Sequence, residues 1–195
     1  MKRFLMILLL FVFIVSMTAC SSSGEEKNVQ KNSYPTPIEE KNEQKTVLGV
    51  FEPEELLPQQ DVEKLLNMKI EHRSKSEDGD MGRKQLRYYN ENKEQCIYLV
   101  LFQQSFVSKN SDFNVITVYN QNKANCLKYD GVEPVDALGD DAYYDNMSGY
   151  LTVLLGEYNF KIDDTLSDFS SSDRKAAELE LARIVEKNLK EKLEK

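Results

Sequence analysis

The chain has 195 residues, of which 41% are hydrophobic and 30% are charged, as in an ordinary globular protein. Its 33 acidic and 25 basic side chains give a formal net charge of -8 at pH 7. An acidic surface repels nucleic acid and anionic lipid headgroups, and no basic stripe interrupts this one, so we expect no nucleic-acid partner.

Residues 1–19 have the pattern of a signal peptide. Lys2 and Arg3 precede an unbroken apolar run, Phe4–Val15, and small or polar residues follow it. A basic start, an apolar run and a small-residue cleavage site are typical of secretory signals. The run is shorter than the roughly 20 residues that a membrane-spanning helix needs, which leaves a marginal uncleaved anchor as the weaker alternative.

The border of this segment, Met17-Thr18-Ala19-Cys20, resembles the lipobox of bacterial lipoproteins, with Met17 where that family usually has Leu. In the family, a diacylglyceryl group is attached to the cysteine and a dedicated peptidase cleaves before it. The resemblance implies that Cys20 is the lipid-attachment residue and that the mature protein lies on the extracytoplasmic face of the cell membrane. The abundance of Lys, Asn, Glu and Ile favours a Gram-positive source. An ordinary secretory signal with a chance cysteine is the alternative.

Residues 20–48 are predicted to join the lipidated cysteine to the domain as a disordered tether. The stretch is polar, and Pro35 and Pro37 favour extended backbone before them. It cannot bury enough apolar surface to offset its ordering entropy. A coil of about 25 residues spans about 25–30 Å, so the domain would stand clear of the headgroups.

Residues 49–195 are predicted to form one globular domain. In its first half, an apolar face predicts a short helix over Asp61–Met68, and the polar, glycine-containing stretch Ser74–Gly82 predicts a loop. Aromatic and β-branched residues predict strands over Gln85–Asn90 and Cys96–Phe106.

The middle of the domain is predicted to contain both strands and a short helix. Phe113–Tyr119 is predicted to be a third strand and Gln121–Leu127 a short helix, followed by a strand over Ala142–Asn146. Tyr150–Ile162 predicts a β-hairpin, because Gly156 at the first turn position suits a type II′ turn.

The chain ends in a predicted amphipathic helix over Asp173–Leu193, which Ser171 or Ser172 can cap. Its apolar stripe can cover one face of a sheet; a coiled-coil partner is the weaker interpretation, because barely three heptads are present. We therefore predict an α+β fold: an antiparallel sheet of about five to six strands, covered by this helix and one or two short helices.

Val135–Tyr144, followed by the hairpin and the final helix, is similar to small secreted bacterial lipoprotein domains with a PsbP-like α+β fold. The resemblance implies the fold only, because those domains mostly have no assigned function.

The cysteines suggest a disulfide. If Cys20 carries lipid, Cys96 and Cys126 remain as a pair, and the compartment outside the membrane permits disulfides. We therefore predict a Cys96–Cys126 disulfide, which would stabilise the fold by about 3–4 kcal/mol; two free thiols are the alternative.

Motifs for catalysis, metals and cofactors are missing from the sequence. His72 is the only histidine and no G-x-S-x-G elbow accompanies it, so a solvated surface role is favoured. Asp140 and Asp141 could hold Ca²⁺ together with Asp145, but they do not fit the EF-hand pattern and suit turns better. Since no phosphate-binding glycine loop occurs either, we predict no catalytic residue, no metal site and no cofactor.

These features together favour a binding or accessory module of the cell envelope rather than an enzyme. The module would present a sheet face or a hairpin edge to a peptide, an envelope protein or a small ligand. A carboxylate-based envelope hydrolase and a structural subunit of a membrane complex are the alternatives.

Overall fold

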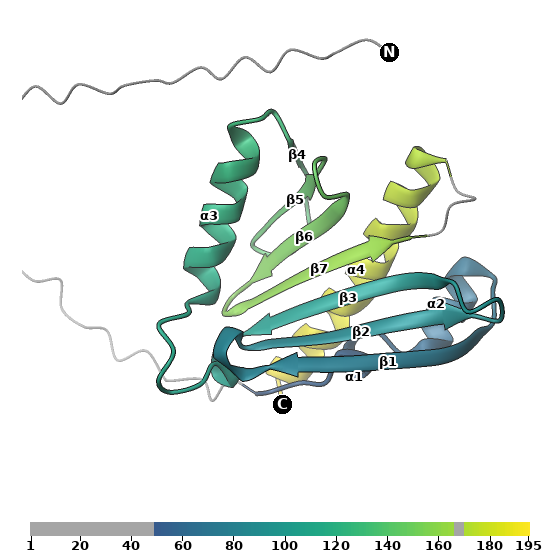
Figure 1. The fold of residues 1–195 in the computed structure, drawn as a ribbon, viewed down its shortest axis with the longest axis horizontal. Helices are drawn as coiled ribbons and strands as arrows, with labels where there is room; N and C mark the ends of the chain where they lie inside the picture. Colours follow the sequence, from purple (N-terminus) through teal and green to yellow (C-terminus); the bar gives the residue numbers. More distant parts are fainter. Residues whose placement is uncertain (1–48, 166–169) are drawn as a thin grey trace, which may run out of the picture. The chain divides into compact units, whose positions relative to one another are not determined.

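The computed structural model describes residues 49–165 and 170–195, which contain one seven-stranded antiparallel sheet and four α-helices (Figure 1). The strands are β1 (Ile70–Asp78), β2 (Arg83–Asn90), β3 (Gln95–Gln103), β4 (Val132–Pro134), β5 (Asp141–Asp145), β6 (Tyr150–Leu155) and β7 (Tyr158–Asp164). They lie in the order β1-β2-β3-β7-β6-β5-β4. The helices are α1 (Pro53–Leu56), α2 (Gln59–Leu66), α3 (Val115–Leu127) and α4 (Ser171–Leu193). The α+β prediction is confirmed, although the sheet has seven strands rather than five or six.

The main core lies between one face of the sheet and helices α1, α2 and α4. Leu181, Val185 and Leu189 recur every four residues along α4 and are fully buried, because that spacing places them on one side of a helix. They pack in one cluster with Leu99 of β3 and Phe160 of β7. Burial of each such side chain contributes about 1.5–3 kcal/mol. The terminal helix therefore covers the sheet as predicted, and its N-cap is Ser170 rather than Ser171 or Ser172.

Helix α3 replaces the strand that the sequence predicts over residues 113–119. The side chain of Asn114 accepts a hydrogen bond from the Thr117 N–H at 2.8 Å and so caps the helix. Val115 and Tyr119, four residues apart, then share one buried face. The alternation of apolar residues in this stretch led to the wrong prediction of a strand, because packing of the buried helix face overrides the β propensity of Val, Ile and Thr. The predicted helix over 121–127 is the second half of α3.

Strand β1 occupies much of the predicted loop at 74–82. The strand is the outermost of the sheet and pairs with β2 from Ile70 opposite Asn90 to Asp78 opposite Arg83. Most of its side chains are exposed. A polar sequence without an apolar face resembles a loop, which is why the strand could not be recognised before its partner was known.

The first described residues are fixed at the end of the sheet where β3 ends and β7 begins. The fully buried amide of Gln103 accepts the Phe51 N–H at 2.7 Å and donates to the Phe51 carbonyl at 3.0 Å. The hydroxyls of Tyr158 and Ser105 each donate to the Gly49 carbonyl at 2.9 Å. The chain that enters the domain is therefore bonded to the sheet from its first described residue.

Candidate functional site

In the part of the chain that the structure describes, strands β1, β2 and β3 have one face that no helix covers extensively. Helices α1, α2 and α4 lie on the core face, and Figure 1 shows α4 behind the strands. On the opposite face, α3 packs over the half made of β4 to β7, where the Tyr119 and Tyr143 rings lie 5.6 Å apart. Within residues 49–165 and 170–195, no helix packs extensively over this second face of β1, β2 and β3, although the Phe113 ring, just before α3, stacks on Phe102 of β3 at 6.0 Å. Side chains that alternate with the core residues of these strands therefore face outward.

Four of these outward side chains and one side chain of β6 form what we call the polar–aromatic strip: His72 of β1, Arg87 and Tyr89 of β2, Tyr98 of β3 and Tyr150 of β6. The guanidinium carbon of Arg87 lies 4.3 Å from the centre of the Tyr98 ring. The Tyr98 and Tyr150 rings are 6.3 Å apart, and the His72 and Tyr89 rings are 5.5 Å apart. His72 is exposed and the other four are half-buried, so the strip is partly held in place and still accessible.

The Arg87 guanidinium at the centre of the strip has spare hydrogen-bonding capacity. Its Nη2 donates to the Gln85 side-chain oxygen at 3.4 Å, an oxygen that also accepts from the Ser76 hydroxyl at 2.8 Å. In the part of the chain that the structure describes, Arg87 forms no ion pair. A guanidinium has five N–H donors, so this side chain can still bind a carboxylate of a partner through two parallel hydrogen bonds.

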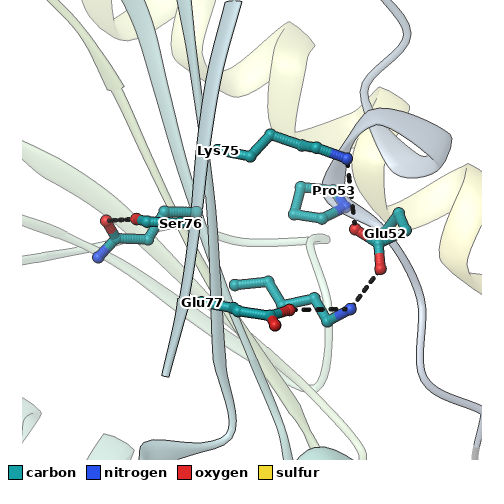
Figure 2. A pocket seen from close by; sticks show the side chains of 7 residues that line it. Glu52, Pro53, Lys75, Ser76 and Glu77 are labelled. Carbon is teal, nitrogen blue, oxygen red and sulfur yellow. Dashed lines mark hydrogen bonds and ion pairs between the residues drawn. The ribbon is translucent and has the colours of Figure 1, made fainter. Parts of the chain in front are cut away.

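A second feature is a pocket of about 350 Å³ on the core side of β1 and β2, beside the start of α1 (Figure 2). Its lining residues are Glu52, Pro53, Lys75, Ser76, Glu77, Lys84 and Gln85. The Lys84 side chain is 9% exposed; its ammonium binds Glu52, lies 3.7 Å from Glu77 and stands 4.7 Å from the centre of the Phe106 ring. The pocket is thus lined by paired charges.

The aspartates considered for Ca²⁺ serve the turns and one ion pair. Asp140 accepts the Gly156 N–H at 2.6 Å, and Asp141 binds the Lys123 ammonium at 2.6 Å. Asp145 accepts the Met147 N–H at 2.9 Å, and hydrogen bonds of this kind lower the pKa of its carboxyl against the effect of burial. No group of three or more metal-binding side chains occurs in residues 49–165 and 170–195.

One buried carboxyl was not singled out from the sequence. Glu178 of α4 is only 3% exposed and accepts the Asp164 N–H at 3.1 Å. Burial raises the pKa of Glu178 to about 7, and the neighbouring carboxylates Asp163 and Asp164 act in the same direction. A sequence signal does exist, because Glu178 lies three residues before Leu181 and seven before Val185 and so belongs to the buried side of the helix by spacing. Its burial makes it a determinant of stability rather than a group presented to a ligand.

The predicted Cys96–Cys126 disulfide is contradicted, because both cysteines are free thiols in the structure. Cys96 is fully buried in the main core, where its Sγ donates to the Tyr88 carbonyl at 3.2 Å. Cys126 lies on α3, near Asp145 and Lys161 on the opposite side of the sheet. The sheet separates the two sulfur atoms, so a bridge would require a different packing of α3.

The two thiols should differ sharply in reactivity. Burial raises the pKa of Cys96 to about 11, and the half-buried Cys126 thiol also has a raised pKa. In native protein, a thiol reagent such as Ellman's reagent is expected to modify Cys126 first and Cys96 only after unfolding. Cys126→Ser should remove the fast phase and Cys96→Ser the slow one. Absence of titratable thiols in unfolded, unreduced protein would instead support the disulfide.

Several predicted features lie outside the described residues: the signal peptide, the tether and Cys20. No helix that the structure describes is long and apolar enough to cross a membrane. No family model, curated protein or solved structure matches the chain, so the site has to be interpreted from its own geometry.

Proposed function

We propose that this protein is a lipid-anchored lipoprotein of the extracytoplasmic membrane face whose domain binds a protein partner through the polar–aromatic strip. The anchor is inferred from residues 1–19 and from the lipobox-like stretch that ends at Cys20. Attachment through two acyl chains is stable, because each buried CH₂ contributes about 0.8 kcal/mol and one chain alone is marginal.

The open sheet face is the observation that supports protein binding. Tyr and Arg are enriched at the centres of protein interfaces, where a few such side chains supply most of the binding energy. In the strip, Arg87 is stacked on Tyr98, which limits the side-chain freedom that binding would remove. Four of its five side chains lie on the open face of β1, β2 and β3, and this extended form suits a protein surface better than a small ligand, which favours a concave site.

The alternative of a carboxylate-based hydrolase has less support. Such an enzyme needs two carboxyl groups about 5–9 Å apart, one of them with a raised pKa. In the pocket, Glu52 and Glu77 both lie within ion-pair distance of the same ammonium, that of Lys84. These two carboxylates are therefore engaged as ion-pair partners. Glu178, whose pKa burial raises to about 7, is only 3% exposed and is not presented to a substrate.

Variants of the strip test the proposed function. A partner is first captured by cross-linking to the full-length protein in its own cells and purified, and its Kd for each variant is then measured. Tyr98→Ser and Arg87→Ala should each raise the Kd about tenfold or more, because each removes a central contact. Lys187→Ala, on an exposed part of α4, is the matched control and should leave the Kd unchanged. Unchanged affinity in both strip variants would contradict the proposal.

A further inference from the structure

A carboxylate of β7, that of Asp163, lies between two tyrosines of the polar–aromatic strip. Asp163 pairs with Tyr98 of β3, and the register of β6 with β7 brings Tyr150 beside it from the other side. Ile162 belongs to the core, so Asp163, the next residue of the strand, points to the opposite face. The two tyrosines belong to strands about 10 Å apart, yet their rings lie 6.3 Å apart, so they lean toward each other over Asp163.

The Asp163 side chain is half-buried, and its charge is not balanced nearby. Within residues 49–165 and 170–195 it forms no ion pair. The charged groups that influence one another at this end of β7 are three carboxyls, of Asp163, Asp164 and Glu178, and one guanidinium, of Arg174. Burial raises the pKa of Asp163, Asp164 acts in the same direction, and Arg174 offsets these effects only in part. The ionised carboxylate therefore lacks a sufficient counter-charge.

The other cations of this face do not serve Asp163. Arg87 lies on the far side of Tyr98, because Arg87 and Asp163 both pair with Tyr98, from opposite neighbouring strands. That arrangement separates the two backbones by about 10 Å. Lys161 lies on the same face, two residues before Asp163, and the carboxylate that acts on its ammonium is that of Asp145. An ammonium or guanidinium from another molecule would therefore supply the missing charge.

The surroundings of Asp163 suit a basic side chain. A lysine ammonium donates charge-assisted hydrogen bonds to a carboxylate and is attracted by the faces of tyrosine rings. The half-buried Tyr98 and Tyr150 rings supply such faces at the rim of the carboxylate. A neutral side chain at the same place would leave Asp163 without a counter-charge, and a carboxylate would be repelled.

We propose that the protein partner of the strip places a lysine or arginine side chain beside Asp163, at the rim of the Tyr98 and Tyr150 rings. This inference rests on the proposed function, since it specifies the chemistry of that partner. Arg87, on the other side of Tyr98, donates hydrogen bonds to a carboxylate of the same partner. The partner surface therefore carries a base and an acid about 10 Å apart, and Asp163 rejects surfaces on which both groups are acidic.

Model compounds test the Asp163 site without the partner. Nα-acetyl-lysinamide, Nα-acetyl-glutaminamide and tetramethylammonium chloride are titrated, at matched ionic strength, into the full-length protein in an uncharged detergent. Resonances of Tyr98, Tyr150 and Asp163 are followed by NMR. The lysine compound should shift them with a Kd on the order of tens of mM, at least about fivefold below the Kd of the other two. Tetramethylammonium is a cation without N–H donors, so equal binding of all three compounds, or tighter binding of tetramethylammonium, overturns the proposal.

Variants assign this preference to the Asp163 carboxylate. Asp163→Asn should abolish the preference for the lysine compound, and Asp163→Glu should retain it, because only the second variant keeps the charge. Asp112→Asn, at an exposed position of a loop, is the matched control and should behave like the parent protein. A preference that persists in Asp163→Asn, or that is lost in Asp112→Asn, overturns the proposal.

The captured partner separates this inference from the proposed function. Asp163→Asn should raise the Kd of the partner at least about fivefold, because a buried charge pair loses one member. If Tyr98→Ser and Arg87→Ala weaken binding while Asp163→Asn leaves the Kd unchanged, the inference fails and the proposed function holds. If none of the three variants changes the Kd, the proposed function fails and the inference fails with it.

Discussion

Replacing Cys20 with alanine should abolish the incorporation of labelled palmitate into the protein. If Cys20 is the lipidated residue, its sulfur is the only attachment point for the diacylglyceryl group, and its loss also prevents cleavage before residue 20. The acyl chains provide about 0.8 kcal/mol for each buried CH₂, so the variant loses this contribution and keeps only the uncleaved apolar run Phe4–Val15 as a marginal anchor. Metabolic labelling and gel mobility measure both effects.

The other two cysteines provide matched controls for the anchor. Cys96→Ala and Cys126→Ala each remove one sulfur atom from the domain and should leave the label and the cleavage unchanged. Palmitate that persists in Cys20→Ala, or that disappears only in one of the two controls, would contradict attachment at Cys20.

Replacing Glu178 with glutamine should flatten the pH dependence of the free energy of unfolding. Because burial raises the pKa of Glu178 from 4.5 to about 7, the folded protein keeps a proton that the unfolded chain loses between these values. Stability due to this group is therefore fully present below about pH 4.5, falls by about 1–3 kcal/mol as the pH rises toward 7, and is constant above it. Glutamine stays neutral, so the variant should be more stable than the parent protein at pH 8.

Urea unfolding at a series of pH values measures this difference. The glutamine side-chain oxygen can still accept the Asp164 N–H, so the variant changes the charge and keeps the hydrogen bond. Glu180→Gln is the control: it lies two residues further along α4, with half of its side chain exposed. If the free energy of unfolding of Glu178→Gln changes with pH between 4.5 and 7 as much as that of the parent protein, the Glu178 carboxyl is not the source of this pH dependence.

The sequence predicted those elements whose own residues carry the folding signal. The Tyr150–Ile162 hairpin has alternating apolar residues around Gly156, and α4 has an apolar stripe, so both could be recognised locally. β1 and α3 could not. The polar sequence of β1 becomes a strand only because β2 supplies its hydrogen bonds, and α3 forms because Asn114 caps it and Tyr119 packs on the sheet.

The candidate site was less predictable than the fold. The strip joins β1, β2, β3 and β6, and only the strand order brings Tyr98 and Tyr150 together. The sequence of β2 contains a local signal for the strip, because Arg87 and Tyr89 alternate with the core residues Leu86 and Tyr88. The cysteine prediction failed for a similar reason: sequence separation does not show that the sheet stands between Cys96 and Cys126.

Photo-cross-linking in intact cells tests most directly whether the open sheet face binds a protein. A benzophenone amino acid is placed at position 98 in the strip and, as control, at position 187 on α4 in the full-length protein. Protein binding through the strip predicts a discrete, light-dependent adduct with one envelope protein from position 98, and none from position 187. No adduct from position 98, or the same adducts from both positions, would contradict binding through the open face.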